Sequence, residues 1–136
     1  MHVEDNPGDV MLLREALKDS RVPNDYLVAE DGDDALRALH SAATGAGLLP
    51  DLILLDINLP RKDGWEVLRD IKQDLRLARI PVIVLTTSTD GNDVRTAYDL
   101  HASCYLSKPN DLDAFLRLAK LIEEFWLIQV RLPIQS

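Results

Sequence analysis

Apolar side chains recur along the chain with two spacings that alternate from one segment to the next. Continuous apolar runs, typical of buried strands, lie at residues 26–29, 52–55, 81–86 and 104–107. Between them, apolar residues three or four positions apart predict helices over residues 7–19, 33–40, 64–75, 93–101 and 111–126. Strand and helix in regular alternation predict an α/β fold, a three-layer αβα sandwich with a parallel sheet in its centre.

The same spacing predicts which helical side chains face the core. In the third predicted helix, Leu68, Ile71 and Leu75 share one face. The last helix has two apolar stripes, of which the first contains Leu112, Phe115, Ala119, Ile122 and Trp126. The second stripe contains Leu118, Leu121 and Phe125. One stripe suffices for the core, so the second needs a partner.

That partner has two candidates. A second copy of the chain could cover the stripe and make a homodimer, with the apolar tail at residues 127–136 prolonging the contact. Alternatively, the tail folds back over its own domain. The apolar pattern alone does not separate these alternatives.

The first strand is irregular. Only His2 and Val3 stand between Met1 and the acidic pair Glu4-Asp5, whereas strands usually have about five or six residues. Either the sheet contains a truncated strand, or residues upstream of Met1 have been lost. We favour the second interpretation, because a very short strand in mid-sheet leaves backbone groups of its neighbours unpaired.

Composition narrows the class of protein. With 136 residues, 46% of them hydrophobic, the chain is expected to form one domain, residues 1–136. A net charge of −8 without a basic cluster disfavours binding to nucleic acid or to anionic lipid. No membrane-length apolar run or secretion signal is present, so we expect a cytoplasmic protein. The three histidines lack ligand spacing and are expected to be solvated or on helix faces.

Chemistry-bearing residues gather where the predicted strands end. Glu4 and Asp5 follow the first strand, Asp56 the third, Thr86 ends the fourth and Lys108 follows the fifth. In open α/β sheets this edge is where binding sites form. Three carboxylates would repel one another unless a hard cation such as Mg²⁺ joined them. Lys108 and Thr86 would suit a phosphoryl group placed beside that cation.

As a set, these residues and their neighbours resemble a known family. The matching motifs are Val3-Glu4-Asp5-Asn6, Leu55-Asp56-Ile57-Asn58-Leu59-Pro60 with Gly64, Leu85-Thr86-Thr87, and Tyr105-Leu106-Ser107-Lys108-Pro109. They resemble the receiver domain of two-component response regulators, which has the CheY-like, flavodoxin-like fold. The resemblance implies a five-stranded parallel sheet with strand order 2-1-3-4-5.

The resemblance also implies a role for each residue. Asp56 would accept the phosphoryl group, and Mg²⁺ would be held by Glu4, Asp5, Asp56 and the backbone carbonyl of Asn58. Lys108 would contact the phosphoryl oxygens, and Thr86 with Tyr105 would form a conformational switch. The Lys108–Pro109 peptide bond would be cis. Such a chain is a phosphoacceptor signalling domain, not an enzyme in its own right, and its phosphoryl donor is a sensor histidine kinase.

The end of the chain resembles a narrower group. Phe125-Trp126, Leu132-Pro133, residues 98–101 and Cys104-Tyr105 are similar to the single-domain regulators paired with bacterial phytochrome histidine kinases, several of which are homodimers. This implies a phytochrome-type kinase, an unidentified downstream protein, and a homodimer through Leu118, Leu121, Phe125 and Trp126.

Two rival functions remain to be weighed. A phosphatase with an aspartyl-phosphate intermediate needs a second acid two residues after its nucleophile, but Asn58 occupies that position. A binding module that is never phosphorylated would not need the complete set of acids, threonine and lysine. Both rivals are therefore disfavoured.

Overall fold

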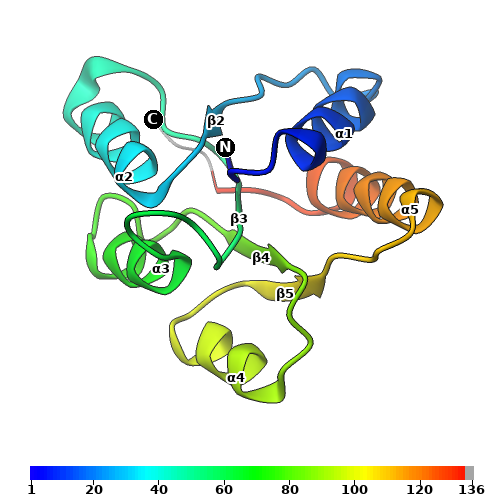
Figure 1. Cartoon of the computed structure of the whole chain (residues 1–136). Coiled ribbons are helices and arrows are strands. Elements are labelled where there is room, and N and C mark those ends of the chain that lie inside the picture. The colour runs from blue at the N-terminus through cyan, green and yellow to red at the C-terminus, as the bar shows by residue number, and fades with distance from the viewer. Residues whose placement is uncertain (134–136) are drawn as a thin grey trace.

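The computed structural model describes residues 1–133, and its centre is a five-stranded parallel sheet (Figure 1). The strands are β1 His2–Val3, β2 Val28–Ala29, β3 Ile53–Leu55, β4 Val82–Thr86 and β5 Cys104–Ser107. Their order in space is β2-β1-β3-β4-β5, as the family resemblance implied. Every neighbouring pair is parallel, so all five strands end at one edge of the sheet.

Five α-helices connect and flank the described strands, and each begins just after an asparagine or aspartate. The helices are α1 Pro7–Lys18, α2 Gly32–Ser41, α3 Gly64–Gln73, α4 Gly91–Asp99 and α5 Leu112–Ile122. Their N-cap side chains, which accept backbone N–H bonds in the first turn, are Asn6, Asp31, Asp63, Asp90 and Asp111. Because these caps set where each helix starts, they also set the loops that carry the strand-end residues.

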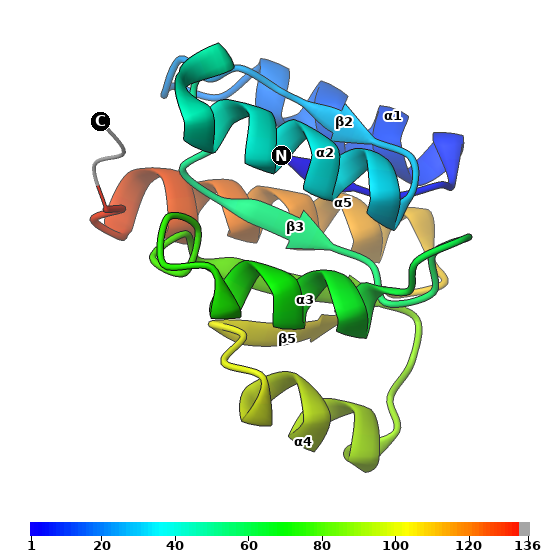
Figure 2. The ribbon, with the colours of Figure 1, turned by 90° about the vertical axis from the view of Figure 1, so that its left-hand side faces the viewer.

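The helices cover both faces of the sheet. Figures 1 and 2 show α1 and α5 together on one side and α2, α3 and α4 on the other. Side-chain alternation in β3 explains the two layers: Ile53 and Leu55 pack into the core beneath α2 and α3, whereas Leu54 packs into the core beneath α1 and α5. The predicted sandwich is therefore confirmed.

The first strand is short, as predicted. His2 and Val3 pair with β2 on one side and with β3 on the other, and both are buried. Met1 extends the contact, because its amino group donates to the Leu52 carbonyl at 2.8 Å and its carbonyl accepts from Leu54 N at 2.9 Å. The loss of upstream residues stays a prediction.

Three local expectations were wrong. Helix α3 ends at Gln73, because Asp74 adopts extended backbone, so Leu75 is 95% exposed and Leu77 takes its place in the core. Leu112, the first residue of α5, is 55% exposed, since the helix first reaches the core one turn later. Residues 1–133 contain no cis peptide bond, so Lys108–Pro109 is trans, the form favoured for X–Pro bonds in general.

Beyond Ile122 the helix widens into π-helical turns, Glu123–Gln129. Leu127 and Leu132 line a pocket of about 860 Å³ together with Met1, Leu49 and Leu52, at the sheet edge opposite Asp56. The described part of the tail therefore folds back, and residues 134–136 lie outside the described part.

None of the helices within residues 1–133 is both long enough and apolar enough to span a bilayer.

Candidate functional site

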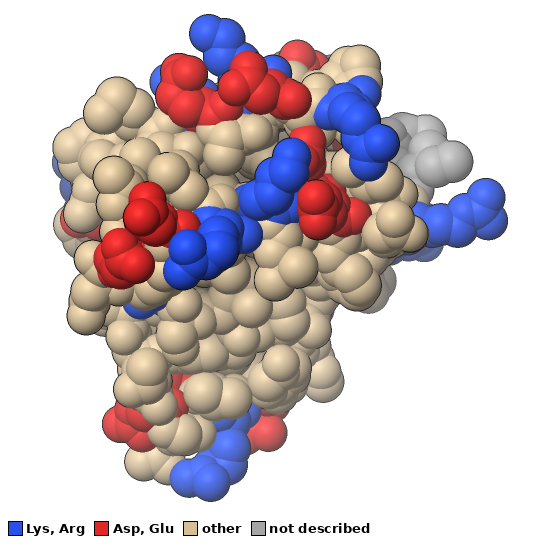
Figure 3. Space-filling view, turned by 90° about the vertical axis from the view of Figure 1, so that its right-hand side faces the viewer, with Lys and Arg blue, Asp and Glu red and all other residues tan. Residues whose placement is uncertain are grey.

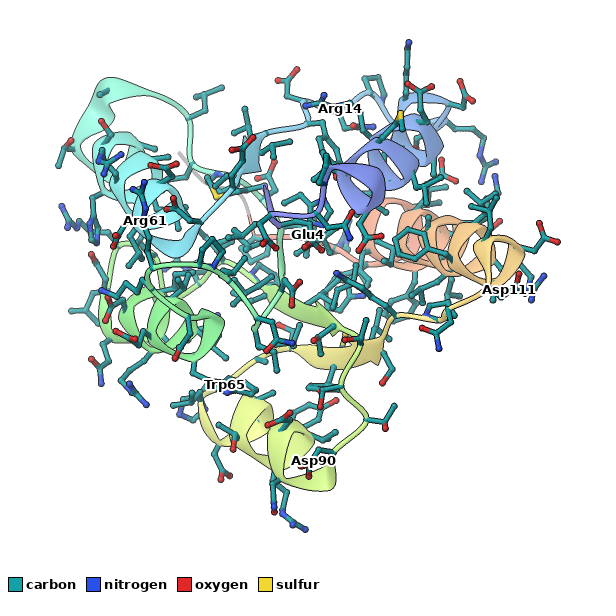
Figure 4. All side chains as sticks on the ribbon, viewed as in Figure 1. Glu4, Arg14, Arg61, Trp65, Asp90 and Asp111 are labelled. Carbon is teal, nitrogen blue, oxygen red and sulfur yellow. The ribbon has the colours of Figure 1, made fainter. Side chains whose placement is uncertain are left out.

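The predicted strand-end residues meet at the carboxyl edge of the sheet. Glu4 lies near the centre of the molecule, where the chain passes from β1 into α1 (Figure 4). Asp56 follows β3, Thr86 ends β4, and Lys108 follows β5. Glu4, Asp56, Thr86 and Lys108 are all buried, although each carries a polar or charged group. Buried polar groups at a sheet edge need partners, and most of these residues are partners of one another.

Three carboxylates form one cluster. Glu4, Asp5 and Asp56 each offer an oxygen that lies within 4.8 Å of the other two. Glu4 and Asp56 are buried, whereas Asp5 is exposed at the mouth of the cluster. A set of oxygen donors with one side open to water fits a hard divalent cation that keeps some of its water ligands. The cluster confirms the predicted proximity of these acids, and the Asn58 carbonyl stays a prediction as a further ligand.

Lys108 is the cation of the site, and it has more partners than the sequence indicated. Its ammonium group donates to Glu4 Oε1, to Asp56 Oδ2 at 3.2 Å and to Asp9 Oδ2 at 2.9 Å. Asp9, in the first turn of α1, was not predicted, because its contact with Lys108 depends on how that helix is oriented at the edge of the sheet. The backbone N–H of Lys108 donates to the Thr86 carbonyl at 2.6 Å and ties β5 to β4.

Burial and the lysine shared among three acids together shift the pKa values of the site. Burial raises the pKa of Glu4 to about 7, and the charge of Asp56 adds to the shift while Lys108 opposes it. For Lys108, burial acts to lower the pKa, but hydrogen bonds to Glu4 and Asp9 outweigh it and raise the pKa above its ordinary value. Lys108 is therefore a firmly held positive charge next to Asp56.

The loop after Asp56 is shaped by a glycine. A Cβ atom on Gly64 would lie 2.5 Å from the Asp56 carbonyl oxygen and 2.4 Å from Ile57 Cα, which is closer than atoms can approach. Its backbone N–H donates to the Ile57 carbonyl at 3.1 Å, and Asn58 N donates to Asp56 Oδ1 at 3.0 Å. These contacts orient the Asp56 carboxylate toward Lys108.

The predicted switch residues have contrasting surroundings. Thr86 is fully buried, and its hydroxyl has no hydrogen-bond partner within the described residues. Tyr105, on the neighbouring strand, is half-buried and donates its hydroxyl to the Ser88 carbonyl at 2.8 Å. Ser88 was not predicted, because it acts through its backbone carbonyl, a group that every residue type has.

Beneath the acids lies His2, which was expected to be solvated or on a helix face and is instead buried in a strand. His2 is only 2% exposed, and its Nδ1 forms a hydrogen bond with the Tyr26 hydroxyl. Its Nε2 lies 3.9 Å from Glu4 Oε1. Burial, followed by the charge of Lys108, lowers the pKa of His2 to about 3, so the ring is neutral. The expectation of a solvated histidine fails because its strand lies between two others.

Comparison with known proteins gives consistent results. Residues 1–120 match the response regulator receiver domain family. Response regulator Rcp1 of Synechocystis sp. is 45% identical over 132 residues, which cover 96% of this chain and 90% of Rcp1. The Mn²⁺-bound structure of Rcp1 is similar with a TM-score of 0.93 and 44% identity, covering 98% of this chain and 96% of that one. The structure of the phosphorylated cyanobacterial phytochrome response regulator RcpA is similar with a TM-score of 0.92 and 47% identity, with the same coverage.

Proposed function

The chain belongs to the response regulator receiver domain family, whose function is to accept a phosphoryl group on an aspartate, and we propose that Asp56 is the acceptor. One observation carries this assignment: Asp56 alone among the described acids at the carboxyl edge follows the central strand β3 and also contacts both Lys108 and the acidic cluster. The proposal makes the whole chain a signalling receiver, with residues 127–136 as its tail.

The geometry suits attack by a carboxylate on phosphorus. One Asp56 oxygen forms the new P–O bond while the P–N bond of a phosphohistidine breaks, and its electron pair passes to the imidazole of the donor. Asn58 N holds Oδ1 of Asp56 in place, and Lys108 stands 3.2 Å from Oδ2. Lys108 neutralises charge on the transferring group, which reduces repulsion between two anions.

A divalent cation fits the acidic cluster, and we propose that it is Mg²⁺, held by Glu4, Asp5, Asp56 and the Asn58 carbonyl. Receiver domains bind Mg²⁺ or Mn²⁺ in an acidic pocket of this kind, and the similar regulator Rcp1 has a Mn²⁺-bound crystal form. Bound there, the cation would supply positive charge to the phosphoryl oxygens. The three carboxylates offer its oxygen ligands, and the exposed Asp5 leaves its water side open.

The Thr86 hydroxyl, which has no partner within residues 1–133, supports the proposed switch. A buried hydroxyl without a partner is costly, and a phosphoryl group on Asp56 would bring new acceptor oxygens to this edge. Movement of Thr86 toward them would leave space beside β5. Tyr105 would break its hydrogen bond to the Ser88 carbonyl and move into this space. That movement would alter the surface formed by α4, β5 and α5.

Receiver domains are phosphorylated by histidine kinases, and we propose a phytochrome-type kinase as the donor for this chain. Two similar regulators, Rcp1 and RcpA, support this, since RcpA is a cyanobacterial phytochrome response regulator. We also propose a cytoplasmic location, slow self-dephosphorylation, an unidentified downstream protein, and a homodimer through Leu118, Leu121, Phe125 and Trp126.

Labelling by a small phosphodonor tests the acceptor. Incubated with radiolabelled acetyl phosphate and Mg²⁺, wild type is expected to become labelled and Asp56→Asn is not, because the amide lacks a nucleophilic oxygen anion. Asp51→Asn is the matched control, since Asp51 is exposed and precedes β3 at the opposite edge. Label that persists undiminished in Asp56→Asn would remove Asp56 from its role.

A further inference from the structure

Buried His2 and half-buried Tyr26 form a pair that lies against the acidic cluster from beneath. Their rings meet edge to face with centroids 5.8 Å apart, and the Tyr26 hydroxyl is hydrogen-bonded to His2 Nδ1. The Arg14 guanidinium lies 5.3 Å from the centroid of the Tyr26 ring, on its face. Tyr26 is therefore held between Arg14 and His2, and the imidazole is fixed in its orientation.

The partners of the ring decide where its proton sits. A neutral imidazole has one nitrogen that donates and one that accepts, whereas an ionised carboxylate only accepts. Because Nε2 faces Glu4 Oε1, the proton belongs on Nε2. The lone pair then lies on Nδ1, where the Tyr26 hydroxyl donates to it. Tyr26 thus selects the tautomer that presents a donor to Glu4.

At 3.9 Å, however, Nε2 and Oε1 are too far apart for a hydrogen bond. The same Oε1 atom accepts from Lys108. If Lys108 moves to a phosphoryl group on Asp56, Glu4 loses that donor while remaining 1% exposed. Asn6 N still donates to Glu4 Oε2 at 3.3 Å, but Oε1 is left without its donor. A buried carboxylate oxygen in that position is disfavoured, and a shift of about 1 Å would bring it within reach of Nε2.

We propose that His2, oriented by Tyr26, is a positioning residue. Its Nε2 donates a hydrogen bond to Glu4 Oε1 once Lys108 has moved to the phosphoryl group. The inference rests on the proposed function, because it needs a phosphoryl group on Asp56 to draw Lys108 away. It adds a role for two residues that lie outside the acid, threonine and lysine set. This change of donor keeps the Glu4 carboxylate in the acidic cluster in both the unphosphorylated and the phosphorylated protein.

The first test uses beryllium trifluoride, a mimic of the phosphoryl group, together with Mg²⁺. His2→Leu fills the buried position with an apolar side chain and removes the donor, whereas His2→Gln keeps a donor. Replacing an outer-shell partner costs roughly 10–100-fold, so His2→Leu should weaken binding of the mimic about tenfold while affinity for Mg²⁺ alone stays near that of wild type. His2→Gln should restore most of the loss. Calorimetric titration measures both affinities, and thermal melting compares the stability of the variants.

Each outcome has one meaning. Equal binding of the mimic by wild type and His2→Leu overturns the inference and leaves the proposed function intact. Equal losses for Mg²⁺ and mimic in both variants, with lowered melting temperatures, mean that His2 only packs the sheet and also overturn it. A wild type that does not bind the mimic at all defeats the proposed function and the inference that depends on it.

The first part of a second test needs neither phosphorylation nor its mimic. Nitrogen NMR of the metal-free protein is expected to show the His2 proton on Nε2, and Tyr26→Phe should let the Nδ1 tautomer appear. Adding Mg²⁺ and beryllium trifluoride to wild type should move the Nε2 proton downfield as its bond to Glu4 forms. A wild-type ring with its proton on Nδ1 would overturn the inference directly.

Discussion

At the residue scale, Thr86 has a buried hydroxyl whose missing partner would be supplied by the proposed phosphoryl group on Asp56. Its fully buried hydroxyl has no partner among residues 1–133. Leaving such a group unsatisfied costs about 1–3 kcal/mol. Thr86→Val replaces the hydroxyl with a methyl group of similar size, so it should raise the free energy of unfolding of the metal-free protein by about 1 kcal/mol. Urea denaturation monitored by circular dichroism measures this change.

The same substitution should impair the response to phosphorylation. With Mg²⁺ and acetyl phosphate, Thr86→Val should still be labelled but should not show the altered Tyr105 environment of wild type by NMR. Thr87→Val, at an exposed neighbouring position, is the control for both measurements. A variant less stable than wild type would show that Thr86 has a partner in solution after all.

Glu4 gives a pH dependence whose sign follows from burial. Its pKa is about 7 in the folded protein against an ordinary value of 4.5, so between these values the folded state binds more protons than the unfolded state. Raising the pH from 4.5 to 7 should therefore destabilise the metal-free wild type relative to Glu4→Gln, which cannot titrate. Chemical denaturation in EDTA at a series of pH values measures the difference. A constant difference would contradict the raised pKa.

Site residues differed in how visible they were in the sequence. Glu4, Asp5, Asp56, Thr86 and Lys108 were predictable, because parallel strands must end at one edge of the sheet. Three other participants, Asp9, Ser88 and His2, were not. Their roles depend on a helix orientation, a backbone carbonyl and the position of a strand between two others, and residue type encodes none of these directly.

At the scale of elements, apolar runs and helical spacing were sufficient to place the five strands and the five α-helices of the described residues, but they did not fix where the helices end. The third helix stops two residues early because Asp74 leaves helical geometry and its side chain bonds Arg76. The amino group of Lys72 then donates to the carbonyls of Ala78 and Ile80, closing the turn that buries Leu77. The spacing of apolar residues does not show that these local hydrogen bonds end the helix.

The short strand β1 leads to a prediction about stability. Beyond Met1, the neighbouring segments continue as Leu27 and Leu52, and the pocket of about 860 Å³ lies between them. Three apolar residues placed before Met1 could extend β1 into this gap and bury side chains there. If the extension contributes about 1 kcal/mol, the melting temperature should rise by roughly 2–4 °C or more.

Scanning calorimetry compares the extended chain with wild type. An extension of three serines is the matched control, because it adds backbone without apolar surface. Equal melting temperatures for the apolar extension and wild type would mean that the tail at Leu127 and Leu132 already fills the gap.

At the scale of the whole molecule, the face formed by α1 and α5 carries its charges unevenly. Figure 3 shows a broad uncharged area between charged side chains in the upper half of the view and a second charged group at the foot, where α4 lies. Leu116, Leu121 and Phe125 of α5 and its continuation are among the exposed large apolar side chains. Exposed apolar surface of this kind marks a place where another chain could bind.

The structure divides the four proposed dimer residues into two pairs. Leu118 and Trp126 pack partly against their own core, so replacing them would disturb the fold itself. Leu121 and Phe125 are 55% and 52% exposed. The rings of Phe125 and Trp126 meet edge to face, with centroids 5.6 Å apart. Only the second pair can be truncated to test assembly without removing core contacts.

Phe125→Ala is therefore the sharpest test of the dimer. In a symmetric contact each substitution changes two copies of the residue, so the variant should be monomeric at micromolar concentration while wild type is dimeric. Labelling of Asp56 should be unaffected, because Phe125 follows α5 and Asp56 follows β3 at the sheet edge. Leu75→Ala is the matched control, since Leu75 is 95% exposed and follows α3, on the face of the sheet opposite to α5. Sedimentation velocity decides the question: a monomeric wild type ends the dimer proposal, and a dimer that survives Phe125→Ala places the interface elsewhere.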